Sequence, residues 1–168
     1  IRPGTVHTFE FPIRHAGTYW YHSHTRHQEQ SGVYGSIVID PATPGVREAD
    51  REAVLVLSDW SRERPEEIFR SLLRGTEWYE IRKGTAQSLL GAIRAGAWRE
   101  FWQREKSRMP PMDISDIAYD AFLINGAETT HLTARPGETV KLRLINAGAA
   151  TYFYLESATG PLTIVAAD

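Results

Sequence analysis

The hydrophobic and polar residues of the chain follow two periods. Apolar, aromatic and β-branched residues dominate short segments bounded by Gly, Pro, Asn or Asp, which is typical of β-strands. The predicted strands are residues 5–11, 18–22, 36–40, 53–57, 121–124, 139–145, 151–155 and 162–166. In contrast, apolar residues recur every three or four positions within residues 65–108, which predicts two helices. We therefore expect a mostly β protein with a helical insertion.

A turn and two strands recur along the sequence. Arg2-Pro3-Gly4 returns 133 residues later as Arg135-Pro136-Gly137. At the same offset Phe9 and Phe11 align with Leu142 and Leu144, and residues 18–21 (TYWY) align with residues 151–154 (TYFY). A turn and strands that keep one register indicate two similar β units in tandem.

The two units are joined by a predicted linker. The stretch from Pro41 to Asp50 combines Pro41, Pro44 and Gly45 with charged side chains, which disfavour regular structure, so residues 42–52 are assigned as the linker. We expect residues 1–41 to be the last strands of an incomplete first domain. Residues 53–168 are expected to form a second domain, incomplete at its C-terminal end, with the helical insertion at about 62–108.

Composition narrows the chemistry. The 168 residues include no cysteine, which excludes disulfides, a cysteine nucleophile and a copper site with a thiolate ligand. The net charge of -2 argues against binding to nucleic acid, and the apolar runs are far shorter than the roughly 20 residues that a membrane-spanning helix needs. The first residues carry neither an initiator methionine nor an export signal, which indicates processing or truncation.

Two of the six histidines form the pair His22-Ser23-His24 at the end of an aromatic strand. Alternate residues of a strand share one face and lie roughly 6.5 Å apart along it, so these imidazoles can serve one metal ion or two adjacent ions. Imidazole suits copper, zinc, iron and nickel. The aligned positions of the second unit hold Leu155 and Ser157, so the strand itself does not require histidine. We interpret the pair as metal ligands rather than as surface histidines.

Two metal-binding β architectures use such a pair. The cupin barrel joins a glycine, a His-x-His pair and a glutamate, and Gly17, His22, His24 and Glu29 come close to that order. The glycine spacings are one residue short, however, and a cupin needs a further histidine in a proline-glycine context, for which only His131 remains downstream. The cupin stays open as an alternative.

The second architecture is that of the multicopper oxidases, which the chain resembles over essentially its whole length. The segments that carry the resemblance are residues 17–24 (GTYWYHSH), 34–41 (YGSIVIDP), 57–60 (LSDW), 123–126 (LING) and 135–138 (RPGE). Residues 28–32 (QEQSG) and the helical insertion are similar to the copper-resistance (CopA-type) branch. The resemblance implies a cupredoxin-like Greek-key β-sandwich, namely the end of one such domain and most of a second.

The resemblance also implies a function, namely an oxidoreductase that uses oxygen as acceptor. In this family Cu(I) or a small phenolic donor is oxidised, and the electrons reduce oxygen to water at a three-copper cluster. Carried over to matching positions, His22 binds one copper of the cluster's binuclear pair and His24 the other, and the remaining ligands lie outside this chain. A role in copper resistance in the periplasm is implied as well, with a laccase-like parent as a close variant.

Side chains near the pair have candidate roles of their own. Groups that accept the free N–H of each imidazole orient metal ligands, and the polar residues 28–30 are near enough in sequence. Glu29 is in addition a candidate proton relay. We interpret His27 as a surface residue, and Met109 and Met112, whose thioethers suit Cu(I), as part of a loop that packs on the core.

The other copper motifs of the family are missing from this sequence. No HWHG precedes the pair, no HCH block follows it, and no cysteine is present for the mononuclear copper. We therefore expect an internal segment of a longer oxidase, inactive by itself. A hypothesis of another class stays open: a non-catalytic β-sandwich module that binds copper through His22, His24 and His27.

Overall fold

A computed structural model of the chain describes residues 2–43, 49–74, 78–107 and 117–167. The elements, in chain order, are β1 (Gly17–His22), β2 (Tyr34–Ile39), β3 (Arg51–Trp60), α1 (Pro65–Leu73), α2 (Trp78–Lys83), α3 (Leu89–Arg94), α4 (Trp98–Ser107), β4 (Ala121–Ile124) and β5 (Val140–Asn146). Strands therefore form with ends within three residues of the predicted positions 18–22, 36–40, 53–57, 121–124 and 139–145.

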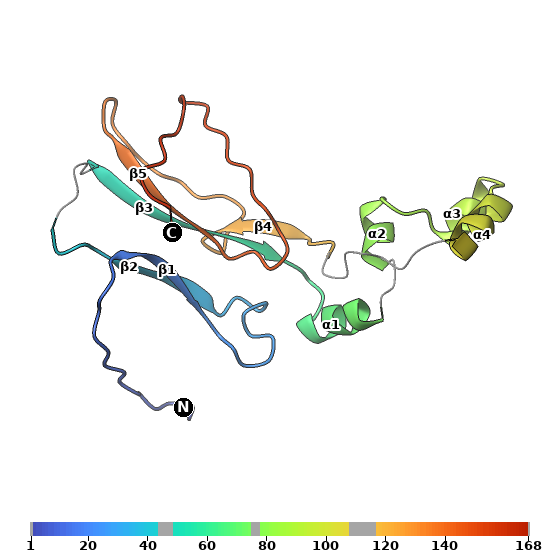
Figure 1. Cartoon of the computed structure of the whole chain (residues 1–168), viewed down its shortest axis with the longest axis horizontal. Helices are drawn as coiled ribbons and strands as arrows, with labels where there is room; N and C mark the ends of the chain where they lie inside the picture. The colour runs from blue at the N-terminus through green and yellow to red at the C-terminus, as the bar shows by residue number, and fades with distance from the viewer. Residues whose placement is uncertain (1, 44–48, 75–77, 108–116, 168) are drawn as a thin grey trace.

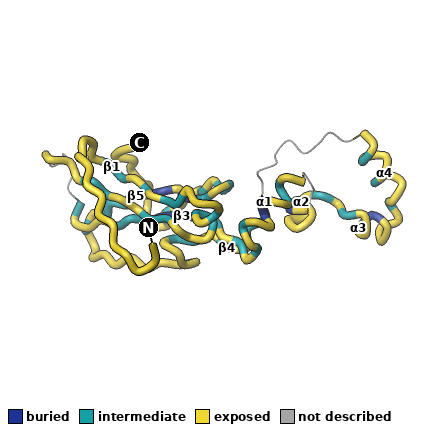
Figure 2. Tube along the Cα trace, turned by 90° about the horizontal axis from the view of Figure 1, so that it is seen from below, coloured by how far each residue is buried: buried dark blue, intermediate teal, exposed yellow. Residues whose placement is uncertain are grey.

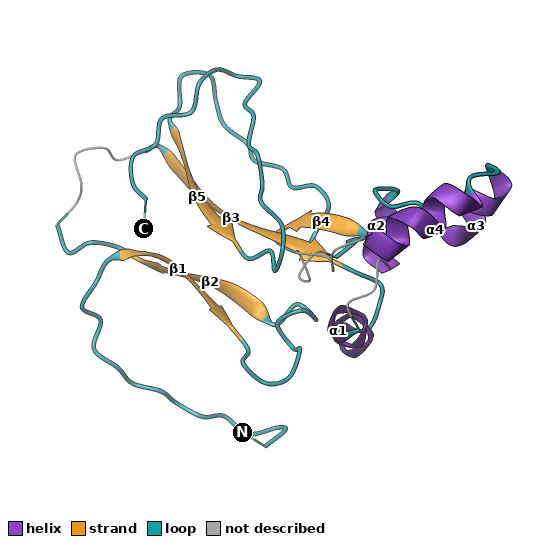
Figure 3. Ribbon diagram, turned by 45° about the vertical axis from the view of Figure 1, so that its right-hand side comes forward, coloured by secondary structure: helices purple, strands orange, loops and turns teal. Residues whose placement is uncertain are grey.

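The strands make two sheets that lie one over the other (Figures 1 and 3). β1 and β2 form an antiparallel pair in which His22 is opposite Tyr34. In the second sheet β3 is central, antiparallel to β4 and parallel to β5. Two facing sheets are consistent with the expected fragment of a β-sandwich.

A small apolar core joins the sheets. Val56 of β3, Ile145 of β5 and the following Ala147 are buried, and Trp20 and Tyr34 of the first sheet pack against them. Strand alternation explains why these particular side chains form the core, because every second side chain of a strand points to the same face. The histidine-bearing strand is thereby held on the second sheet by its aromatic residues.

Polar contacts cross the same interface. The hydroxyl of Tyr34 donates to Oγ of Ser58 at 2.6 Å, and Ser58 is 1% exposed. The guanidinium of Arg143 on β5 donates to Oγ1 of Thr18 on β1 at 2.8 Å and pairs with Glu52 of β3 at 2.8 Å. Hydrogen bonds from Lys141 and from Arg143 lower the pKa of the Glu52 carboxyl. Arg143 therefore links strands of both sheets.

The repeated turn predicted from the sequence is present in both copies. The amide of Thr5 donates to the carbonyl of Arg2, and that of Glu138 to the carbonyl of Arg135, each at 3.1 Å. Gly4 and Gly137 have φ of +76° and +88°, values that favour glycine, and Pro at the preceding position is typical of a type II turn. The two units share their entry turn in structure as well as in sequence.

Three predicted strands are wrong. Residues 5–11, 151–155 and 162–166 are irregular, and most of their apolar side chains are exposed, for example Val6 at 95% and Tyr154 at 100%. A strand requires a neighbour that takes its backbone hydrogen bonds. Among the described residues only β3 is paired on both edges, and residues 5–11, 151–155 and 162–166 do not pair with the open edges of β1, β2, β4 or β5.

The prediction of two helices is also wrong, because the insertion forms α1 to α4. Gly84 follows α2 with φ +75° and Gly96 follows α3 with φ +69°, and such left-handed residues end helices. Figure 2 shows α3 and α4 lying away from the sheets with most of their length exposed. No helix among the described residues is long and apolar enough to cross a membrane.

The near end of the insertion has its own core. Ile68 of α1, Tyr79 of α2 and Ile117 before β4 are buried together. The Tyr79 hydroxyl donates to the carboxylate of Glu63 at 2.9 Å, and Arg82 pairs with the same carboxylate. Burial, together with the hydrogen bond to Glu63, raises the pKa of Tyr79 to about 12.

Replacing Arg143 with Met tests the link between the sheets. We expect Arg143→Met to lower the free energy of unfolding by about 1–3 kcal/mol, because hydrogen bonds of a charged and 10% exposed side chain are lost. Urea denaturation measures it. The control is Lys141→Met, which removes an ion pair with the same Glu52 but does not reach β1, and is expected to cost less than about 1 kcal/mol. Equal losses in both variants would contradict the link.

Alkaline denaturation tests the packing of Tyr79. The hydroxyl ionises near pH 10 in an unfolded chain but near 12 when folded, so its stabilising contribution is complete below pH 10 and is lost as the pH rises from about 10 to 12. We expect Tyr79→Phe to flatten the fall of stability over that interval. Tyr154→Phe is the control, because the Tyr154 side chain is fully exposed. An unchanged slope in Tyr79→Phe would show that this hydroxyl is not buried.

Candidate metal centre

The two histidines of the predicted pair lie side by side. β1 ends at His22, and His24 follows two residues later on the loop that leads to β2. Their ring centroids are 4.5 Å apart with a tilt of 31° between the planes. His22 is half-buried and His24 is exposed. The rings are therefore close enough to serve one metal ion or two neighbouring ions, as the spacing predicted.

Trp20 supports the pair from the strand side. Its ring stacks on that of His22 with centroids 4.0 Å apart and planes 9° from parallel. Trp20 also packs against the core between the sheets, so the His22 ring rests on a fixed aromatic surface. Sequence reasoning missed this contact, although the signal was present: residues 20 and 22 are two positions apart and therefore lie on the same face of the strand.

Glu29 returns to the pair across the loop. Its Oε2 lies 2.7 Å from Nδ1 of His22, and the two side chains are 30% and 23% exposed. Of the other polar residues proposed to orient the rings, Gln28 instead accepts a hydrogen bond from the Ser23 hydroxyl at 2.7 Å. Glu29 thus contacts the His22 ring, and Gln28 braces the loop.

The remaining candidates lie apart from the pair. His27, interpreted as a surface residue, is half-buried, with its ring centroid 5.3 Å from that of Phe69 on α1. Packing of the loop against the insertion, which sequence alone did not indicate, explains this burial. His7, His15 and His131 are exposed. Met109 and Met112, and part of the predicted linker, lie outside the described residues.

The donor set fits copper in part. A neutral imidazole whose Nδ1–H is held by a carboxylate presents the lone pair of Nε2, and imidazole nitrogen is a good ligand for copper. Among the described residues no group of three or more His, Cys, Asp or Glu side chains is placed to hold a metal ion. The pair can therefore supply two ligands of a site but not a complete coordination sphere.

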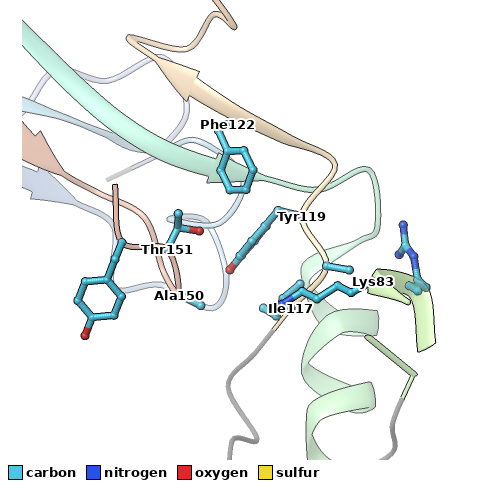
Figure 4. Close-up of a pocket in the computed structure, with 9 residues that line it drawn as sticks. Lys83, Ile117, Tyr119, Phe122, Ala150 and Thr151 are labelled. Carbon is cyan, nitrogen blue, oxygen red and sulfur yellow. The ribbon is translucent and has the colours of Figure 1, made fainter. Parts of the chain in front are cut away.

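A separate cavity of about 510 Å³ opens between the end of α2, the segment before β4 and the loop after β5 (Figure 4). The residues that line it are Arg82, Lys83, Ile117, Ala118, Tyr119, Phe122, Ala150, Thr151 and Tyr152. None of them carries an imidazole or a carboxylate, and none belongs to the loop of the histidine pair. This cavity is not part of the metal centre.

Comparison with protein-family models adds the decisive observation. Two models, both described as multicopper oxidase, match residues 1–44 and residues 51–168. This chain belongs to the multicopper oxidase family. This membership excludes the cupin alternative and makes the described elements parts of cupredoxin-like domains. The cofactor of the family is copper.

Individual multicopper oxidases are similar along the whole chain. It is 37% identical to copper resistance protein A of Pseudomonas syringae pv. tomato and 38% identical to that of Escherichia coli, each alignment covering 100% of this chain and 29% of the relative. Multicopper oxidase MmcO of Mycobacterium tuberculosis is 30% identical over 100% of this chain and 32% of its own length. The chain thus spans about a third of the length of these relatives or less. No solved structure matches it.

Proposed function

We propose that this chain contributes two histidine ligands to the oxygen-reducing copper cluster of a copper-resistance multicopper oxidase. His22 binds one copper of the cluster's binuclear pair and His24 binds its neighbour. The enzyme to which the chain contributes oxidises Cu(I) or a small phenolic donor and reduces oxygen to water. The similarity to copper resistance proteins along the whole chain supports this branch and a periplasmic location.

The observation that carries the proposal is the geometry of the pair. Two imidazoles 4.5 Å apart, inclined by 31° to each other, lie where a strand gives way to a loop. Because the ring planes are tilted and not parallel, each imidazole can direct a nitrogen to a different ion while the ions stay close. Copper held by His22 and His24 would supply the redox chemistry that transfers electrons from the donor to oxygen. The protein side chains hold the two ligands at a fixed separation.

The division of the chain follows from the same proposal. Residues 1–41 are the last strands of a first cupredoxin domain, residues 42–52 connect, and residues 53–168 belong to a second domain that carries the insertion at about 62–108. The separate family matches to residues 1–44 and 51–168 support this division, as do the positions of α1 to α4. The described residues supply only two ligands together, so the isolated chain is expected not to turn over.

Copper titration of the purified 168-residue chain tests the ligand roles. We expect Cu(II) to bind with nitrogen hyperfine structure in its electron paramagnetic resonance spectrum. His22→Ala and His24→Ala should each weaken binding by more than about tenfold, because losing a ligand costs at least as much as losing a group that orients one. The matched control is His131→Ala, which removes an exposed histidine outside the loop.

Two results of this titration would contradict the ligand roles. One is binding that survives His22→Ala and His24→Ala unchanged. The other is a loss in His131→Ala as large as in either variant, which would indicate adventitious binding by surface imidazole.

Oxygen uptake tests whether the chain is inactive alone. With Cu(I) or a phenolic donor, we expect the copper-loaded 168-residue chain to consume no more oxygen than the same amount of free copper. Turnover abolished by His22→Ala would contradict this expectation and would assign a complete active site to the chain. One copper bound per chain at modest affinity, with loss in His27→Ala and no turnover, would instead favour the non-catalytic copper-binding module.

A further inference from the structure

The contact between Glu29 and His22 joins residues seven positions apart and depends on the fold of the loop between β1 and β2. The amides of Ser31 and Val33 donate to the carbonyl of Gln28, and the amide of Gly32 donates to that of Glu29. These bonds fix the backbone on either side of Glu29. An ordered turn, rather than a freely moving loop, thus places the Glu29 side chain against the His22 ring.

Two side-chain contacts brace the start of this loop. The Ser23 hydroxyl donates to the amide oxygen of Gln28 at 2.7 Å, and the same hydroxyl accepts from the amide of Thr25 at 3.1 Å. The amide of Ser23 also donates to the carbonyl of Val33, which closes the loop next to β1. Ser23, the residue between the two histidines, therefore ties their backbone to the turn that carries Glu29.

The His22 ring is bounded on several sides. Trp20 covers one part of it at 4.0 Å, the ring of His24 lies 4.5 Å away, and Glu29 occupies the Nδ1 edge at 2.7 Å. An ionised carboxylate can only accept hydrogen bonds, so this contact requires the proton of a neutral imidazole to be on Nδ1. The lone pair of the ring is then on Nε2.

We propose that Glu29 is a positioning residue that holds His22 in the Nδ1–H tautomer and orients its Nε2 toward the copper. This inference rests on the proposed function, because it takes His22 as a copper ligand. It assigns Glu29 an action through the ligand, distinct from the proton-relay role considered on sequence grounds. Carboxylates that accept from a ligating histidine raise the basicity of the ligand and commonly change metal affinity by about 10–100-fold.

Three variants of the 168-residue chain test the role. Glu29→Gln keeps an oxygen that can accept from Nδ1–H, Glu29→Ala removes the acceptor, and Gln28→Ala loosens the loop while leaving Glu29 in place. The first measurement is the tautomer of His22 in the metal-free chain at pH 8, read from the ¹⁵N shifts of its ring. The second is Cu(II) affinity by competition with a chelator.

We expect the wild type and Glu29→Gln to keep the proton on Nδ1, with copper affinities within a few fold of each other. Glu29→Ala should mix the two tautomers and lower the affinity by about 10–100-fold. Gln28→Ala should have a smaller effect on both measurements. Backbone amide spectra of the metal-free variants control for folding, because a purely structural role of Glu29 would disturb shifts throughout the loop without a selective change at the His22 ring.

The outcomes separate this inference from the function on which it rests. If His22→Ala leaves copper affinity unchanged, the ligand role fails whatever Glu29 does. If His22→Ala weakens binding but Glu29→Ala alters neither the tautomer nor the affinity, the positioning role alone is overturned. It is equally overturned if Glu29→Gln loses as much as Glu29→Ala, or if either substitution tightens copper binding.

Discussion

The packing of Trp20 and Tyr34 onto Val56, Ile145 and Ala147 is the interaction on which the rest of the structure depends. A two-stranded sheet has too little buried surface to be stable by itself in water. β1 and β2 therefore keep their shape because the second sheet covers one of their faces. The same contact fixes Trp20, on which His22 stacks, so core packing and the position of the His22 ring are linked through one side chain.

The histidine centre is built locally, although it completes no coordination sphere. Residues 20 to 33 contain the stacking surface, both imidazoles, the carboxylate that contacts Nδ1 and the hydrogen bonds that order the loop. In the proposed site the further ligands lie outside the described residues, which contain no cluster of three metal-binding groups. In the proposed site, residues 20 to 33 hold His22 and His24 in position before the other ligands are added. We regard this preparation as the contribution of the chain to an oxidase.

Features of the fold that depend on residues within one segment were predicted from the sequence, whereas features that depend on distant residues were not. Alternation and turn chemistry predicted β1, β4 and the Arg135-Pro136-Gly137 turn, because each is determined by residues within the segment. Residues 5–11 and 151–155 carry equally good strand patterns but form none, since a strand also depends on a distant partner. In the site, the His22 and His24 spacing was informative. The contact of Glu29, and not Gln28, with His22 and the burial of His27 against Phe69 could be found only from the folded loop, whereas strand alternation already placed Trp20 beside His22.

The central claim is that His22 and His24 bind neighbouring copper ions and that His22 does so through Nε2. The most direct measurement is a titration of the ¹⁵N-histidine-labelled chain with Cu(I), followed by the ring nitrogen resonances of each histidine. We expect Nε2 of His22 and one ring nitrogen of His24 to shift together, Nδ1 of His22 to keep its proton, and His7, His15 and His131 not to respond. Metal binding at Nδ1 of His22, or shifts confined to the other histidines, would contradict it.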